Sequence, residues 1–515
     1  MSKITRKDFL GLSSAMVVSA GLSACVGTQA TASASAPATA KAPPNKGKVL
    51  IKNADVLTMN TARDELTGTD VLVENGKIVS IGKGLSAPDA EIIDASGMIL
   101  MPGMIDGHRH VWECIEAGRL VKFHPAEYST YQQWKMRTIV SMNADEMYLS
   151  GLVGGLLAID SGVTSMLDYA HGQINQENAI ASAKGLQDSG IAGWFGFQLG
   201  VSSSYKPGDT VDLTRAHSER IARTTETHWA TADALKRDVF NDPDALLQMG
   251  LCPASGMGDE LSLIKDEWTR ARSYDLGILG AHIHKPETPF PPGHMGHRGS
   301  GMLDLADAGM LGPDYHISHA NRLTEDEFRV LRESGGMVCA TAMGEFPYMT
   351  AAYRGPSCHG RARAAGVATG IGIDVSLALT HDYFEHVRAG FWNLYLSPEG
   401  VALANDYKAH DALDFATNLG AKAVRLENVA GSIETGKRAD LVLLKTDRPG
   451  FGRLGTLADR VVTFAAREDI DSVWIAGQAR KRGGEMVDVD LKDLMQKVYA
   501  AQDRYGPLAE SITFV

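Results

Sequence analysis

MPGMIDGHRH, residues 101–110, reads as an apolar strand that ends in two histidines, His108 and His110. Side chains at positions i and i+2 of an extended strand point to the same side, so these two imidazoles can reach one metal ion. His-x-His pairs also occur by chance, and most of them bind nothing. The pair therefore predicts a metal site only if the rest of the chain supplies further ligands at the same place.

Downstream of this strand, stretches of helical periodicity alternate with short apolar strands, which is the pattern of β/α units around a parallel sheet. Helices are expected at residues 144–161 and 259–275. Further strands are expected at residues 162–168, 191–197, 246–251, 277–284, 315–319, 337–341 and 368–374. With the His-x-His strand these make about eight, so the α/β class and a (β/α)8 TIM barrel are predicted.

A small β domain is expected before the barrel. Residues 48–81 read as short strands, and Asn75-Gly76 is a tight hairpin signal between two of them. This segment runs into the His-x-His strand without a linker, so the two parts are expected to pack together.

Several metal-ligating residue types occupy the ends of the expected strands. In a (β/α)8 barrel these ends meet at one mouth, where active sites form. Each residue has a plainer alternative: His284 as a core histidine, for example, or Asp374 as a helix cap. Five such side chains at strand ends, four imidazoles and a carboxylate, nevertheless suit a divalent metal. The five are His108, His110, His284, His319 and Asp374.

The motifs around these residues resemble those of the amidohydrolase superfamily, and within it the cytosine deaminase/triazine hydrolase-like branch. The resemblance covers roughly residues 48–483. It implies a discontinuous β-sandwich domain built from residues 47–100 and 426–515, with a tail helix, around a barrel of residues 101–425. The motifs are PGMIDGHRH (102–110), GVTS (162–165), HKPE (284–287), SHA (318–320), GID (372–374) and GSIETGKRADLV (431–442).

The resemblance also implies a role for each site residue. His108, His110, His284 and Asp374 would bind the metal, and Asp374 would also accept a proton from the attacking water. His319 would polarise the water or the substrate. Glu287, three residues after His284, would shuttle a proton; a solvated loop carboxylate is the alternative for it.

One divalent metal is expected, with zinc as first choice and iron or manganese also suited to imidazole ligands. Binuclear members of the superfamily carry a carboxylated lysine or a glutamate at the end of strand four. Here the expected strand of residues 246–251 runs into Cys252-Pro253-Ala254-Ser255, which supplies neither.

Four residues are candidates for contact with the substrate. Trp112 and Trp194 could stack on a flat ring, although core packing is an equal alternative. His294 lies in a Pro- and Gly-rich segment after the His284 strand. Glu345 stands where many relatives carry a Pro-x-Ser-Asn element, so the motif that would name the heterocycle is missing. For both, a solvated loop position is the alternative.

These residues predict a hydrolase that uses metal-activated water on a C–N or C–halide bond, with deamination of an N-heterocycle as first choice. Hydrolysis of an amide or carbamate in an exogenous compound is the second choice. A non-catalytic binding protein on the same fold is a third. Release of ammonia, release of an amine with a carboxylate, or metal binding without turnover separates the three.

The first residues predict export. A basic start, the apolar residues 10–22 and Leu22-Ser23-Ala24-Cys25 resemble a lipoprotein signal peptide of residues 1–25, with Cys25 as the lipidated residue. Residues 5–10 resemble a twin-arginine signal with Lys7 at the second arginine, so the route stays open. Residues 26–46 read as a flexible linker. A periplasmic, membrane-anchored protein is expected.

Composition limits the partners. The net charge is −12 without a long basic run, so a small-molecule substrate is expected and nucleic acid is not. Contact with a membrane is expected only through the lipid at Cys25, and a homo-oligomer stays open. The five cysteines are scattered, which indicates neither a disulfide framework nor a thiolate zinc site.

Overall fold

The computed structural model describes residues 47–119, 128–220, 223–256, 259–282, 301–345, 357–396, 402 and 405–515. Within these ranges, no helix combines the length and the apolar character needed to cross a bilayer.

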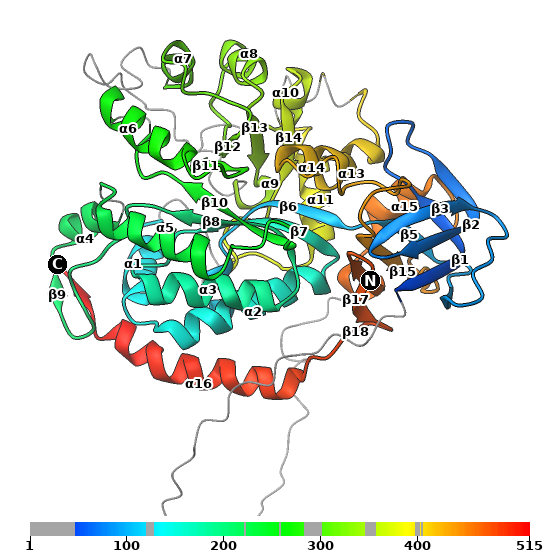
Figure 1. Cartoon of the computed structure of the whole chain (residues 1–515), viewed down its shortest axis with the longest axis horizontal. Helices are drawn as coiled ribbons and strands as arrows, with labels where there is room; N and C mark the ends of the chain where they lie inside the picture. The colour runs from blue at the N-terminus through cyan, green and yellow to red at the C-terminus, as the bar shows by residue number, and fades with distance from the viewer. Residues whose placement is uncertain are drawn as a thin grey trace, which may run out of the picture. The chain divides into compact units, whose positions relative to one another are not determined.

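A parallel eight-stranded sheet forms the centre of the structure (Figure 1). Its strands lie in chain order around the sheet, and each coincides with a strand expected from the sequence, so the (β/α)8 barrel is confirmed. Most strand residues are buried, as expected for parallel strands covered by helices. The strands are β6 (Met104–Arg109), β7 (Val163–Ala170), β8 (Ala192–Gln198), β10 (Leu247–Cys252), β11 (Leu279–His282), β12 (Tyr315–Ser318), β13 (Met337–Ala340) and β14 (Ala368–Ile371).

The first and last strands of the barrel meet at the site residues. Backbone hydrogen bonds run from His110 N to Asp374 O at 3.0 Å and from Asp374 N to His108 O at 2.9 Å. Gly372 makes this approach possible, because a Cβ there would lie 2.5 Å from the His108 carbonyl oxygen. The contact that closes the barrel therefore also brings His108, His110 and Asp374 together.

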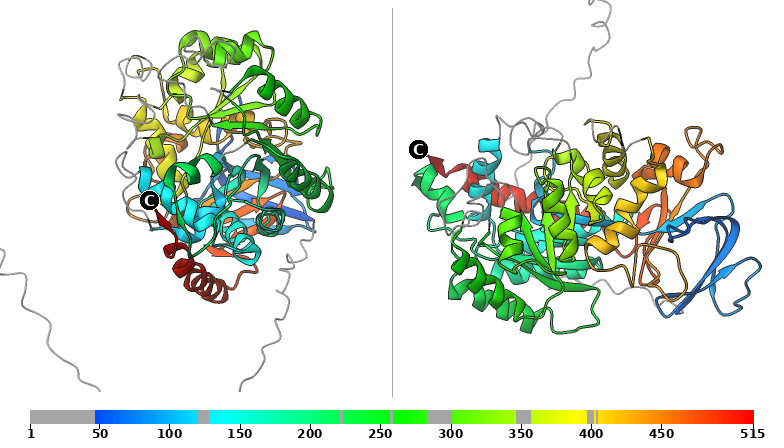
Figure 2. Two further views of the ribbon diagram at one scale, coloured as in Figure 1. Left: turned by 90° about the vertical axis from the view of Figure 1, so that its left-hand side faces the viewer. Right: turned by 90° about the horizontal axis from the view of Figure 1, so that it is seen from above.

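A second sheet is built from both ends of the described chain, as the sequence predicts. It is mostly antiparallel, and β5 pairs with β1 from one end and with β15 from the other. Figure 2 shows these early and late strands together beside the barrel. The strands are β1 (Lys48–Leu57), β2 (Glu65–Glu74), β3 (Lys77–Gly82), β4 (Glu91–Asp94), β5 (Ile99–Pro102), β15 (Leu441–Leu444), β16 (Ile470–Ile475), β17 (Gln478–Arg482) and β18 (Glu485–Met486).

The turn between β2 and β3 is the hairpin that the sequence predicts. Asn75 and Gly76 both have positive φ, 51° and 79°, and Glu74 pairs with Lys77 across them. Asparagine and glycine tolerate this left-handed backbone better than other residues, which explains why the pair marks the turn.

Helices cover the outside of the barrel. The helix expected at residues 144–161 is α2, and Asn143 and Glu146 form a capping box at its start. The helices are α1 (Tyr128–Ile139), α2 (Ala144–Asp160), α3 (Gln176–Asp188), α4 (Leu213–Arg220), α5 (Glu226–Asp238), α6 (Leu261–Arg272), α7 (Gly301–Asp307), α8 (Glu325–Glu333), α9 (Ala342–Glu345), α10 (His359–Ala364), α11 (Tyr383–Asn393), α13 (Ala409–Ala416), α14 (Asn418–Ala423), α15 (Leu457–Phe464) and α16 (Leu491–Glu510), with 3-10 turns η1 (Val111–Glu116) and η4 (Arg467–Asp469).

The tail helix α16 packs against the barrel. It contacts α1, α2 and η1, and Gln502 donates a hydrogen bond to the Ile115 carbonyl. Beyond it, β19 (Thr513–Phe514) pairs with β9 (Thr210–Val211), a short strand after β8. The expected tail helix thus supports the segment that follows His110.

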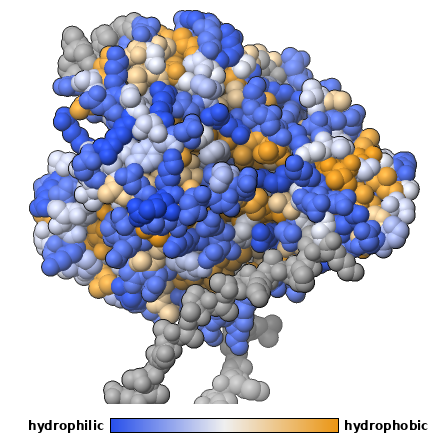
Figure 3. All heavy atoms as spheres, in the orientation of Figure 1, coloured by the Kyte–Doolittle hydropathy of each residue, from blue (hydrophilic) through white to orange (hydrophobic). Residues whose placement is uncertain are grey.

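The face seen in Figure 3 is largely hydrophilic, with apolar patches between the polar side chains. This distribution agrees with the 22% of charged residues and the net charge of −12. Most of the apolar side chains instead form clusters inside the barrel and between the barrel and its helices.

Candidate metal centre and active site

The donor atoms of four histidines and one aspartate converge at the mouth of the barrel. Asp374 Oδ1 lies 3.1 Å from His110 Nε2 and 3.4 Å from His108 Nε2. His282, the last residue of β11, brings its Nε2 to 3.0 Å from His108 Nε2. His319, which follows β12, places its Nε2 3.8 Å from Asp374 Oδ2.

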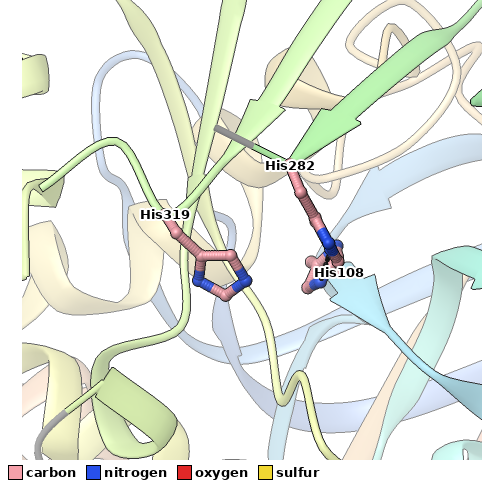
Figure 4. Close-up of side chains that lie close together, drawn as sticks. All are labelled: His108, His282 and His319. Carbon is pink, nitrogen blue, oxygen red and sulfur yellow. Dashed lines mark hydrogen bonds between the residues drawn. The ribbon is translucent and has the colours of Figure 1, made fainter. Parts of the chain in front are cut away.

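These residues form two overlapping groups that could hold a metal. One is His108, His110 and Asp374, and the other is His108, His282 and His319; within each group the donor atoms lie within 4.8 Å of one another. Figure 4 shows the side chains of the second group turned toward one another from β6, β11 and the segment after β12. His108 is common to both groups and lies at the centre of the site.

The Nδ1 atoms of His108 and His110, which face away from Asp374, form hydrogen bonds with residues of the barrel strands. His108 Nδ1 is 2.9 Å from Ser318 Oγ, and His110 Nδ1 is 2.9 Å from the Tyr169 carbonyl oxygen. A carbonyl only accepts, so His110 donates from Nδ1 and its Nε2 keeps a lone pair. Such contacts orient the imidazoles of metal ligands.

Asp106 fixes the backbone beneath these ligands. Its Oδ1 accepts hydrogen bonds from His108 N and Ile373 N, both at 3.2 Å. Its Oδ2 accepts from Arg109 Nε at 2.8 Å, which balances the buried charge. Asp106 therefore joins the strand of His108 to the segment of Asp374 across the closure.

The charge states fit a divalent cation. Burial lowers the pKa of His110 to about 4 and also lowers the pKa of His108, so both rings are neutral near pH 7. Burial alone would raise the pKa of Asp374, but the neighbouring imidazoles, His319 first, hold it well below its ordinary value. Neutral imidazoles and an ionised carboxylate are the donor set that zinc and similar metals prefer.

His319 and Asp374 have unusual backbone conformations. Their φ angles are 63° and 74°, in the left-handed region that residues other than glycine rarely adopt. Such conformations cost about 1–3 kcal/mol each and persist where the surrounding structure imposes them, often at functional sites.

Three predicted site residues, His284, Glu287 and His294, lie outside the described residues, as does Cys25. The structure adds His282, which the sequence reasoning passed over. A signal for it was present, because His282 and His284 repeat the His-x-His spacing and positions i and i+2 of a strand share one face.

Trp112, a candidate for stacking on a substrate ring, contacts the site through His171. Its fully buried indole donates to His171 Nδ1 at 2.8 Å and stacks on Trp134 at 5.3 Å between ring centroids. His171 in turn stacks on His110 at 3.7 Å. Trp112 therefore packs against His110 through His171.

Trp194, the second candidate for stacking on a substrate ring, packs among core residues of the barrel. It lies in the first half of β8, and its indole donates to the Val424 carbonyl at 2.8 Å. Its ring packs with Ile278 and other residues from the early parts of the barrel strands. Core packing, the alternative weighed for this residue, is its role.

Glu345 is buried in the site and is not a solvated loop residue. Its Oε1 lies 3.1 Å from His319 Nδ1. The sequence also allowed Glu345 to face the pocket, and its contact with His319 agrees with that orientation.

An eight-stranded parallel barrel with histidines and an aspartate at its mouth defines the class of metal-dependent barrel hydrolases. The chain belongs to the amidohydrolase family, whose model matches residues 99–480. It is therefore a hydrolase of carbon–nitrogen bonds other than peptide bonds, and the donor set fits the divalent metal that this family binds.

The chain is similar to deaminases of two kinds. It is 26% identical to a 5-methylthioadenosine/S-adenosylhomocysteine deaminase of Symbiobacterium thermophilum, over 78% of this chain and 86% of the relative. It is 24% identical to a 5′-deoxyadenosine deaminase of Methanosarcina mazei, over 88% of this chain and 98% of the relative.

Two solved structures share the fold. An adenosine deaminase from Xanthomonas campestris with bound zinc superposes with a TM-score of 0.72 at 21% identity, covering 90% of this chain and 100% of that one. Atrazine chlorohydrolase from Arthrobacter aurescens, complexed with zinc, gives 0.70 at 18% identity, with coverages of 88% and 99%.

Proposed function

We propose that this amidohydrolase deaminates an N-heterocycle, with adenine nucleosides as the first substrates to test. The observation that carries the proposal is the donor set of His108, His110 and Asp374 with His319 opposite, at the mouth of the barrel. The curated relatives, which are deaminases of 5′-modified adenosines, support the choice of substrate class.

Each site residue has a task in this reaction. His108, His110 and Asp374, together with His284 by family resemblance, would hold a divalent metal, which would supply Lewis acidity and lower the pKa of a water toward ~7. Asp374 Oδ2 faces His319 Nε2, so either group can take the proton that the attacking water loses. Glu287, by family resemblance, protonates the ring nitrogen or the leaving amine.

We propose a single metal and zinc as its identity. The strand order makes β10 the fourth barrel strand, and the residues at its end, Cys252-Pro253-Ala254-Ser255, include no lysine or glutamate to bridge two metals. The zinc in two structures of the same fold supports the choice of metal. Imidazole ligands suit iron and manganese as well, so the metal must be measured.

The test combines elemental analysis with a substrate screen. Protein purified without added metal should contain about one metal per chain, and it should release ammonia from at least one adenine nucleoside or related heterocycle. Glu287→Gln should keep the metal and lose turnover by about 10²–10⁴-fold, the usual contribution of a general acid or base.

The alternative outcomes are distinct. Release of an amine with a carboxylate would make the protein an amide or carbamate hydrolase. Metal without turnover on either class of compound would favour a binding protein on this fold. Protein without metal, from a preparation that binds none when zinc is added, would contradict the catalytic proposal.

We further propose that the protein is exported and held at a membrane by a lipid on Cys25. The basic start, the short apolar stretch and the Leu-Ser-Ala-Cys sequence at residues 22–25 support this proposal.

A further inference from the structure

Glu345 is a buried carboxylate whose described contacts include His319, Thr341 and Asn321. It is the last residue of α9, the short helix that follows β13, and its side chain is 0% exposed. Its Oε1 lies 3.1 Å from His319 Nδ1, accepts from Thr341 N at 3.0 Å, and lies 3.3 Å from Thr341 Oγ1. A buried charge is costly unless donors surround it, so at least one of these groups must supply a proton.

The arrangement determines which nitrogen of His319 carries the proton. An ionised carboxylate only accepts, so the Thr341 hydroxyl and His319 Nδ1 must both donate toward Glu345 Oε1. Thr341 Oγ1 also lies 3.1 Å from His319 Nδ1, where its lone pairs can share the same proton. If Nδ1 carried no proton, its lone pair would face a lone pair of Glu345 Oε1, and the two would repel each other.

We propose that Glu345 is a positioning residue that accepts a hydrogen bond from His319 Nδ1 and so fixes the ring with Nε2 facing Asp374. This inference rests on the proposed function for the task of His319, which is to accept a proton or bind the metal through that nitrogen. In the part of the chain that the structure describes, Glu345 contacts His319 and Thr341, and it acts on the site through His319.

The placement of α9 agrees with this role. A Cβ at Gly344, next to Glu345, would be in van der Waals contact with Asp374 Oδ2, at 3.5 Å. The same short helix therefore borders both Asp374 and His319, whose Oδ2 and Nε2 lie 3.8 Å apart. A glutamate whose only role was to cap the turn of α9 would not need a histidine beside it.

The direct test is the ¹⁵N spectrum of ring-labelled histidine in metal-free protein, because a protonated and a bare ring nitrogen have well-separated shifts. His319→Gln identifies the resonances. The wild-type protein should show a protonated Nδ1 at His319. A bare Nδ1 in the wild type would overturn the inference, whatever the enzyme's activity.

Variants separate positioning from packing. Glu345→Leu should lose the Nδ1–H preference, whereas Thr341→Val, which removes the hydroxyl but keeps the carboxylate, should retain it. An unchanged His319 tautomer in folded Glu345→Leu would contradict the inference. If Glu345→Leu does not fold, Glu345→Gln keeps the shape and removes the charge.

Metal content and kinetics complete the test. Glu345→Gln should keep the metal and lower kcat by about 10–100-fold, with a smaller effect on KM, as for other residues that orient a functional histidine. Loss of metal together with activity would show a structural role instead. Wild-type protein with the expected tautomer but no metal or turnover would contradict the proposed function and leave the tautomer assignment standing.

Discussion

His282 is the residue that most affects the composition of the metal site. Its Nε2 lies 3.0 Å from that of His108, and its ring stacks on Tyr169 at 4.1 Å between centroids. Two imidazole nitrogens at this distance share either a proton or a cation. Burial lowers the pKa of His282 well below its ordinary value, which favours a neutral ring that can bind a cation.

His282→Ala is therefore expected to lower metal affinity by about 10–100-fold. His284→Ala is the matched comparison, since it removes the same group two positions along the chain. Elemental analysis of both proteins after dialysis against a weak chelator gives the answer. Metal loss confined to His284→Ala would make His284 the ligand, as the family resemblance implies, and would leave His282 as a neighbour of the metal.

At the scale of elements, the contact between β6 and the segment after β14 controls both stability and metal binding. Gly372 lies where a Cβ would come within 2.6 Å of both backbone atoms N and O of His108. Gly372→Ala should force these segments apart and destabilise the fold by about 1–3 kcal/mol, the usual cost of overpacking. It should also reduce the metal content, because His108 and Asp374 lie on opposite sides of the closure.

Thermal unfolding and elemental analysis check this expectation. Gly452→Ala is the control, since a Cβ there would meet nothing within 4 Å. A Gly372→Ala protein with wild-type melting temperature and metal content would show that the closure tolerates a side chain, contrary to the prediction.

The elements themselves were largely predictable. All eight barrel strands and the helix α2 followed from apolar runs and helical periodicity, because a strand buried on both faces leaves a continuous apolar signature. The environments of Trp112 and Trp194 were not predictable. Both are aromatic residues near expected strands, and only packing decides that one contacts His171 and the other lies among core residues.

At the scale of the whole molecule, the proposed lipid anchor makes a prediction independent of the barrel. Cys25→Ala should move the protein from the membrane fraction to the soluble fraction of cells that express the full chain, because a protein without the acyl chains loses its hold on the bilayer. Fractionation followed by immunoblotting measures this, with Cys114→Ala as a control at a buried, free cysteine. Unchanged partitioning of Cys25→Ala would contradict lipidation.

The sequence by itself determined the barrel, through its apolar strands and their order along the chain, and the residue types at the strand ends singled out His108, His110, His319 and Asp374 as candidates. The small sheet built from both chain ends was expected from the family resemblance. Only the tertiary structure decided that His282 lies beside His108, that Glu345 contacts His319, and that Asp106 joins the two sides of the closure. Such contacts join residues far apart in the chain, and they depend on side-chain packing that no local pattern records.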